Sequence, residues 1–193
     1  MILLPDTSLA WNFHAVGRMD LVESLIRAMP DPEPSWAREV ARECDRHITE
    51  AMPTLTALFG SPVFPTRTEQ MEAHMVRDDL FRHDGDHAGR HLGESETIAI
   101  WARRAPAIGA VLILTEDRDF VRFCWNSQRI GTRASWHAGG RTFSAVTSAD
   151  VLAANVQLGK LDPTEADQIH ADILDAGRPF IGPAKASRPI TGA

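Results

Sequence analysis

Two short apolar runs, each followed closely by an aspartate, constrain the fold more than any other feature of this chain. The first run covers residues 2–4 and is followed by Asp6; the second covers residues 110–114 and is followed by Asp117. Short, uninterrupted apolar runs are typical of strands buried on both faces, as in a parallel sheet. Parallel strands end at the same edge of their sheet, so both aspartates are predicted to lie at that edge.

Helical periodicity fills most of the chain around the two runs. Residues 143–146 are expected to add a third strand, after a polar loop at about 126–142. Strands that alternate with helices indicate right-handed βαβ connections and a three-layer α/β domain, in which a short parallel sheet is flanked by helices. Apolar side chains recur at helical spacing near residues 21–29, 36–48, 68–82, 94–104, 120–124, 151–156 and 169–174.

The length and composition of the chain suit one main domain. Its 193 residues, 44% of them hydrophobic, are enough to bury a sizeable core without disulfide bonds. The two cysteines, Cys44 and Cys124, lack the spacing of a zinc finger or a disulfide framework, which favours a reducing, cytoplasmic environment. We expect the main domain over residues 1–158, followed over residues 159–193 by a C-terminal helix and a loosely ordered tail from Gly177.

The formal net charge of −6 counts against a protein that coats nucleic acid, since phosphate neutralisation needs a basic surface. A pocket of carboxylates is compatible with this charge, because a basic strip elsewhere can hold a substrate. No stretch reaches the roughly 18 apolar residues that a membrane span requires, so no membrane association is expected. A candidate for the basic strip lies between residues 118 and 141, where arginines alternate with aromatic residues; the alternative is a solvated surface and loop. The residues are Arg118, Arg122, Trp125, Arg129, Arg133, Trp136, His137 and Arg141.

Carboxylates gathered at one sheet edge indicate a divalent-metal site. Hard cations such as Mg²⁺ take oxygen ligands, and a pair of them can activate water and stabilise the leaving oxygen in phosphodiester cleavage. The chain lacks the serine-hydrolase, Walker A, dinucleotide-binding and zinc-protease motifs that would support another chemistry. A single aspartate after a strand is usually a helix cap, so the prediction depends on several acids meeting in space.

Four segments, in their order and spacing, resemble the PIN-domain ribonuclease family. Pro-Asp-Thr-Ser at 5–8 resembles the opening of the family, and Val-Ala-Arg-Glu at 40–43 resembles its second acidic position. Gly-Glu-Ser-Glu at 93–96 resembles the Gly-Glu-x-Glu helix start of one subgroup. Leu-Ile-Leu-Thr-Glu-Asp at 112–117 resembles the family's strand followed by an acid. Together they cover about residues 1–158.

This resemblance implies an endoribonuclease that depends on Mg²⁺ or Mn²⁺ and cuts RNA phosphodiesters. It implies that Asp6, Glu43, Glu96 and Asp117 are catalytic acids and metal ligands, with Glu94 as a further ligand. Many relatives are toxins restrained by an antitoxin protein, often as homodimers. The resemblance therefore implies RNA as the substrate, and an antitoxin protein and a second copy of the chain as candidate partners. The expected supporting residues are Thr7, Ser8, Thr115 and Asp119, and the expected RNA-binding residues are Arg118, Arg122, Arg129 and Arg133.

The choice among neighbouring acids stays open at this point. Glu94 and Glu96 lie two residues apart, about 200° around a regular helix, so a helix would not direct both to one point. Either glutamate could instead serve the helix dipole at the start of its helix. The remaining rivals are Glu39 for Glu43 and Asp119 for Asp117.

Two other classes of function compete with the ribonuclease. One is a catalytically silent PIN-like module that acts through protein contacts, with acids that only cap strands and helices. The other is a different Mg²⁺-dependent phosphate enzyme, such as a DNA nuclease or a phosphatase; the phospho-aspartate type is disfavoured because Asp6 is followed by Thr7 and Ser8. The region 51–92 is longer than in compact family members, and it ends in a group that would suit a transition metal or a polar loop: His83, Asp84, Asp86, His87 and His91.

Overall fold

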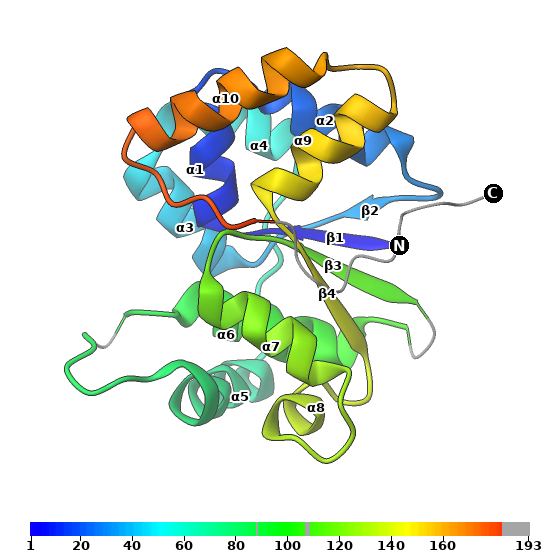
Figure 1. The fold of residues 1–193 in the computed structure, drawn as a ribbon. Helices are drawn as coiled ribbons and strands as arrows, with labels where there is room; N and C mark the ends of the chain where they lie inside the picture. Colours follow the sequence, from blue (N-terminus) through cyan, green and yellow to red (C-terminus); the bar gives the residue numbers. More distant parts are fainter. Residues whose placement is uncertain (88, 107–108, 183–193) are drawn as a thin grey trace.

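The structure, a computed structural model, describes residues 1–87, 89–106 and 109–182. Within these ranges, four parallel strands form one sheet in the order β2-β1-β3-β4. The expected three-layer α/β class, with a short parallel sheet flanked by helices, is confirmed and is consistent with a PIN-like fold (Figure 1). The strands are β1 (Ile2–Pro5), β2 (Glu33–Pro34), β3 (Ala110–Leu114) and β4 (Thr142–Val146).

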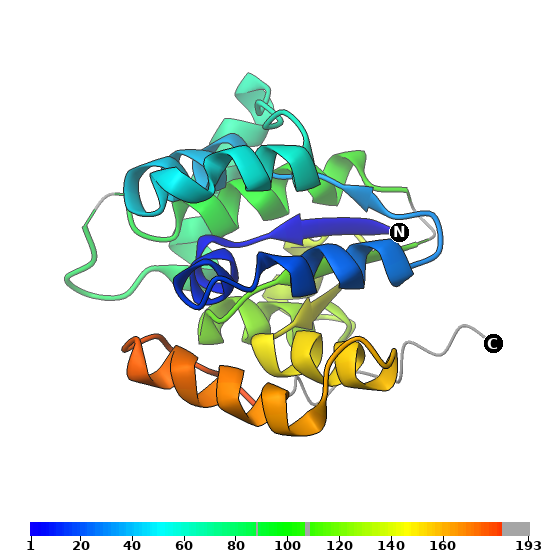
Figure 2. The ribbon, with the colours of Figure 1, turned by 90° about the horizontal axis from the view of Figure 1, so that it is seen from above.

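Helices cover both faces of this sheet. Figure 2 shows α3, α4 and α6 on one face, and α2, α9 and α10 on the other. None of the helices in the described ranges combines the length and the apolar character that a membrane span requires. The helices are α1 (Thr7–Ala15), α2 (Met19–Ala28), α3 (Arg38–His47), α4 (Met52–Phe59), α5 (Arg67–Val76), α6 (Leu92–Arg104), α7 (Arg118–Ser127), α8 (Arg133–His137), α9 (Ser148–Gln157) and α10 (Pro163–Asp175), with a 3₁₀ turn at Thr49–Ala51 and a π-helical turn at Arg77–Phe81.

The central strands are apolar along their whole length because helices bury both of their faces. Leu3 and Leu4 in β1, like Ile113 and Leu114 in β3, have no exposed surface. Burial of such a side chain contributes roughly 1.5–3 kcal/mol to folding. The two apolar runs therefore form the centre of the core, as their composition predicts.

The chain leaves the two central strands, β1 and β3, toward opposite edges of the sheet. From β1 the chain crosses to β2 on one side, and from β3 it crosses to β4 on the other side. A crevice forms where strand order changes in this way, beyond the carboxyl ends of the strands. The backbone N–H of Asp6 donates to the carbonyl of Leu114 at 2.8 Å, so the ends of β1 and β3 are aligned there.

The structure departs from the sequence expectations at several elements, and α1 and α4 lie outside the segments expected to be helical. A two-residue edge strand, β2, lies in a proline-containing segment that carries no strand pattern. The polar loop expected at 126–142 contains the short helix α8. The tail is held at its start, because Asn12 donates to the carbonyl of Pro179 at 2.8 Å and Arg178 lies over the ring of Trp11, at 3.9 Å from its centroid. The expectation of a loose tail over 183–193, with Pro183 and Pro189, lies outside the described residues.

Candidate active site

Asp6 lies at the carboxyl end of β1 and is almost fully buried. It precedes α1, yet its side chain makes no capping hydrogen bond to that helix. Instead its Oδ2 accepts hydrogen bonds from Ser8 Oγ at 2.5 Å and from Thr115 Oγ1 at 2.9 Å. Hydroxyl groups that follow two neighbouring strands therefore orient this carboxylate, which is the supporting role expected for Ser8 and Thr115.

Glu43 reaches the same edge from α3. Thr7 Oγ1, at the start of α1, donates to Glu43 Oε2 at 3.0 Å. The first turn of α6 approaches the carboxylate from the other side, and a Cβ placed on Gly93 would lie 3.2 Å from Glu43 Oε1 and 3.2 Å from Val40 Cγ2. Contacts this short are crowded, so the glycine of the Gly-Glu-x-Glu segment allows α6 to pack closely against Glu43.

Asp117 lies two residues beyond Thr115, just past the end of β3. Its Oδ1 accepts a hydrogen bond from Phe120 N at 2.8 Å and so caps α7, and its own N–H donates to Thr115 Oγ1 at 2.9 Å. The capping role that the sequence suggests for a strand-end aspartate is therefore real at this position. Asp117 caps α7 and also lies close to other acids of this edge.

Glu94, in the first turn of α6, connects the group. It is buried, and its Oε1 lies 3.1 Å from His91 Nδ1. His91, Glu94 and Asp117 each offer one atom able to bind a metal, and these three atoms lie within 4.8 Å of one another.

Electrostatic interactions show that the four carboxylates are close together. Burial raises the pKa of Asp6 to about 7, with further contributions from Glu94 and Asp117. Burial, followed by Glu94 and Asp6, raises the pKa of Glu43 to about 8. Burial and Glu94 also raise the pKa of Asp117. Like charges gathered in a buried site favour either protonation or a bound cation.

The donor chemistry of this group fits a divalent cation. The four carboxylates supply the oxygen ligands that Mg²⁺ and Mn²⁺ prefer. Within the part of the chain that the structure describes, no arginine or lysine forms an ion pair with any of them; their partners are hydroxyl groups, a backbone N–H and His91. We call Asp6, Glu43, Glu94 and Asp117 the acidic centre.

Glu96 does not belong to the acidic centre. Its Oε1 accepts from the backbone N–H of Glu39 at 2.8 Å, and its Oε2 accepts from Arg38 Nη2 at 2.9 Å. It lines a separate pocket of about 310 Å³ on the other side of α6. The structure thus places Glu96 apart from the other three expected acids, because two residues along a helix turn the side chain by about 200°.

The rival acids also lie outside the acidic centre. Glu39 forms an ion pair with Arg42 at 3.1 Å. Asp119 Oδ2 lies 3.1 Å from His83 Nε2, and Asp119 forms an ion pair with Arg122 at 3.2 Å. The sequence predicts that Asp119 supports the site, and the structure instead places it beside the loop that precedes α6.

The loop group expected as an alternative transition-metal site is dispersed. His83 contacts Asp119, and Asp86 binds the backbone N–H of His83 and the guanidinium of Arg90. Among the described residues, His91 alone of this loop joins a set of side chains able to bind a metal. Its place beside the acidic centre was not expected from the sequence, although a histidine three residues before a glutamate at a helix start brings the two side chains together.

Glu116 has a structural role that the sequence pattern does not indicate. It is buried, and it accepts hydrogen bonds from the backbone N–H groups of Ser148, at the start of α9, and of Ile181 at 2.5 Å. This glutamate fixes two segments around the sheet edge and is structural.

Of the expected RNA-binding arginines, Arg118 lies beside the acidic centre. The others follow along α7, just beyond it and at the start of α8. Arg118 and Arg122 occupy exposed positions on α7, whose first turn is capped by Asp117. Arg129, just beyond α7, lies 5.6 Å from the ring centroid of the exposed Trp125. Arg133 is exposed at the start of α8.

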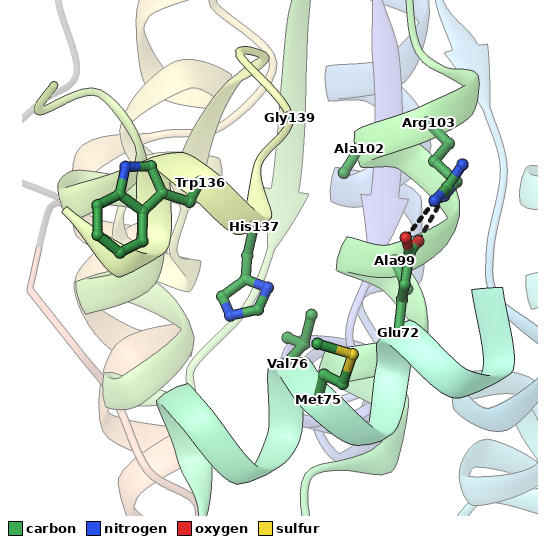
Figure 3. Close-up of a pocket in the computed structure, with 9 residues that line it drawn as sticks. All are labelled: Glu72, Met75, Val76, Ala99, Ala102, Arg103, Trp136, His137 and Gly139. Atoms are coloured by element: carbon green, nitrogen blue, oxygen red, sulfur yellow. Dashed lines mark hydrogen bonds and ion pairs between the residues drawn. The ribbon is translucent and has the colours of Figure 1, made fainter. Parts of the chain in front are cut away.

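Two pockets differ in their relation to this arrangement. One of about 360 Å³ lies between Asp117, Arg118 and residues 179–181, next to the acidic centre. Another of about 290 Å³ lies between α5, α6 and α8, and in Figure 3 its Glu72 is paired with Arg103. The second pocket holds none of the sheet-edge acids, so it is separate from the acidic centre.

Comparison of the chain with protein-family models, with curated proteins and with solved structures found no match.

Proposed function

We propose that this protein is a divalent-metal-dependent phosphodiesterase that acts on nucleic acid. The observation that carries the proposal is the convergence of Asp6, Glu43, Glu94 and Asp117 at the carboxyl ends of β1 and β3, where no arginine or lysine of the described ranges forms an ion pair with them. Clustered, unneutralised carboxylates are costly in a metal-free protein and are the ligand set that two-metal phosphate chemistry needs.

Within this class, we propose a ribonuclease of the PIN-domain type, as the order of the motifs along the chain implies. The three-layer α/β fold and the acids beyond β1, β3 and in α3 and α6 support it. A reducing cytoplasm, an antitoxin and a homodimer belong to the same proposal. The state of the cysteines is in keeping with it, since Cys44 and Cys124 are buried thiols.

Each residue of the acidic centre has a role in this proposal. Asp6, oriented by Ser8 and Thr115, is the central ligand, and Asp117 binds beside it while it caps α7. Glu43 and Glu94 complete the ligand set or orient the attacking water. Divalent cations held there would polarise the phosphate and lower the pKa of the attacking water.

The substrate surface proposed for RNA is the outer side of α7 and the start of α8. Arg118 borders the pocket that also contains Asp117, so a backbone phosphate held by this arginine would lie beside the acids. Arg129 and Trp125 continue the surface with a cation and an aromatic ring, the combination that holds unpaired bases and phosphates.

The test is cleavage of a labelled single-stranded RNA by the full chain with Mn²⁺, with Mg²⁺ and with chelator. We expect cleavage that requires metal, and loss of at least about 100-fold in rate for Asp6→Asn and Glu94→Gln, because each removes a charged ligand from the centre. Thermal melts should show a rise in Tm with metal for the wild type and little rise for the two variants.

Glu96→Gln is the matched control, since it makes the same change as Glu94→Gln two residues away. Its amide oxygen can still accept from Glu39 N, so we expect a folded protein that cleaves RNA within about threefold of the wild-type rate. Loss of activity in both glutamine variants, with normal circular dichroism, would assign Glu96 to catalysis after all. A wild type with neither metal-dependent cleavage of RNA or DNA nor a Tm response would leave a silent binding module.

A further inference from the structure

His91 has an unusual position at the start of α6. It is one of two described non-glycine residues with positive φ, at +61°, a conformation that is uncommon outside glycine and that Asn, Asp and His adopt more often than other residues. Its side chain is only 5% exposed. The ring stacks on Phe81 with centroids 5.7 Å apart, and His83 meets it edge-on at 6.5 Å. Packing therefore fixes the orientation of this imidazole.

The only hydrogen bond of the imidazole among the described residues is to an acid of the acidic centre. Its Nδ1 lies 3.1 Å from Glu94 Oε1, and it shares a 4.8 Å neighbourhood with ligand atoms of Glu94 and Asp117. Its Nε2 is buried without a hydrogen-bond partner among the described residues. A buried polar ring that is left half-unsatisfied calls for an explanation beyond its structural contacts.

We propose that His91 is a nitrogen ligand of the acidic centre, and that His91, Glu94 and Asp117 form a mixed nitrogen and oxygen site for a first-row transition-metal ion such as Mn²⁺. The inference rests on the proposed metal-dependent function and adds the choice of metal. It assigns to His91 a ligand role that the four-carboxylate pattern does not include.

The consequence is selectivity against Mg²⁺. Mg²⁺ requires a near-ideal octahedron of oxygen ligands, whereas imidazole binds transition-metal ions well. A centre made of four carboxylates alone would bind both ions through oxygen. With His91 as a ligand, the site prefers the transition-metal ion.

The direct measurement uses the full wild-type chain, loaded with Mn²⁺ alone and without RNA. Pulsed electron paramagnetic resonance should detect coupling of the bound Mn²⁺ to a ¹⁴N nucleus. Calorimetric titration should give a Kd for Mn²⁺ at least about tenfold lower than the Kd for Mg²⁺, the scale on which single groups around a metal change its affinity.

His91→Asn is the informative variant, because asparagine adopts positive φ with little strain and can offer an oxygen in place of the nitrogen. We expect the ¹⁴N coupling to disappear and the preference for Mn²⁺ to fall by about tenfold, while Mg²⁺ affinity changes by less than about threefold. His83→Asn is the matched control, since His83 touches the ring of His91 but binds Asp119, and it should change neither Kd.

The outcomes separate this inference from the proposed function. Mn²⁺ bound without ¹⁴N coupling, or Mn²⁺ and Mg²⁺ bound with equal Kd, would overturn the role of His91 and leave an all-carboxylate nuclease centre intact. If the wild type binds neither ion, the proposed function and the inference both fall. Because the spectroscopic measurement is made on the wild type, poor folding of the variant would not prevent a decision.

Discussion

Asp6 illustrates how a buried carboxyl group beside other acids can oppose stability. It is buried beside Glu94 and Asp117, and its hydrogen-bond partners Ser8 and Thr115 only partly compensate for lost hydration. Its ordinary pKa is near 4, so the folded protein at neutral pH must either keep a proton on Asp6 or hold a charge next to other charges. The acidic centre therefore destabilises the metal-free protein.

A pH dependence follows for the metal-free protein. Because the pKa of Asp6 is raised to about 7 by folding, the stability linked to its proton is fully present below the unfolded pKa and is lost as pH rises through the folded value. We expect the Tm in chelator to fall between about pH 5 and pH 8. Asp6→Asn should flatten this fall and be more stable than wild type at pH 8 by about 1 kcal/mol or more, since one pKa unit is worth about 1.4 kcal/mol.

The measurement is a series of thermal melts at fixed ionic strength, with the exposed Asp167→Asn as a control for charge removal. That control should follow the wild-type profile. Two results would contradict the claim that the acidic centre destabilises the metal-free protein. One is a wild type whose metal-free Tm is constant over this pH range, and the other is an Asp6→Asn protein that is less stable than the wild type at pH 8.

At the scale of elements, α7 connects the acidic centre to an exposed basic surface. Its first turn is fixed by Asp117, which belongs to the acidic centre, and its exposed side carries Arg118 and Arg122. Positions four residues apart lie on the same side of a helix, so these two cations follow one line away from the acids. In the proposed nuclease, the helix would therefore set the distance between a phosphate held by these arginines and the phosphate at the acidic centre.

We expect Arg118→Ala and Arg122→Ala each to weaken binding of single-stranded RNA. Each lost phosphate contact should reduce the slope of log K against log salt concentration by about 0.7. The measurement is fluorescence anisotropy in the Asp6→Asn background, which separates binding from cleavage. Arg27→Ala, on the distant and exposed part of α2, is the control and should leave the slope unchanged; an equal loss there would indicate only general charge attraction.

At the scale of the whole molecule, the C-terminal segment closes the fold around the sheet edge. α10 adds Ile169 and Ile173 to the core, and the chain then returns to α1 and to the segment after β3. Arg178 stacks on Trp11, and the backbone N–H of Ile181 binds Glu116. Segments far apart in sequence thus share the neighbourhood of the acidic centre.

Truncation tests this closure. A chain ending at Gly177 loses the contacts of Arg178 and Ile181, whereas a chain ending at Gly182 keeps them. A desolvated cation–π contact is worth about 2 kcal/mol, and for a chain of this size 1 kcal/mol corresponds to about 2–4 °C in Tm. We therefore expect the shorter chain to melt at least about 4 °C below the longer one in a thermal scan; equal Tm values would show that the segment adds no stability.

The amino-acid sequence by itself determined the fold class and the strands of the core. Residues 2–4 and 110–114 are short, uninterrupted apolar runs that favour strands buried on both faces, and the helical periodicity between them indicates helical connections. Asp6 and Asp117 follow from the same logic, because parallel strands end at one edge. Chain chemistry and local spacing are sufficient for these features.

Only the tertiary structure decided which glutamates meet those aspartates. Glu94 and Glu96 have the same chemistry, and the rotation of α6 against α3 turns one toward Asp6 and the other toward Arg38. The place of His91 likewise depends on a left-handed residue and on the ring of Phe81, which no periodicity encodes. Packing between elements sets these directions, because a helix can rotate about its axis without changing its own hydrogen bonds.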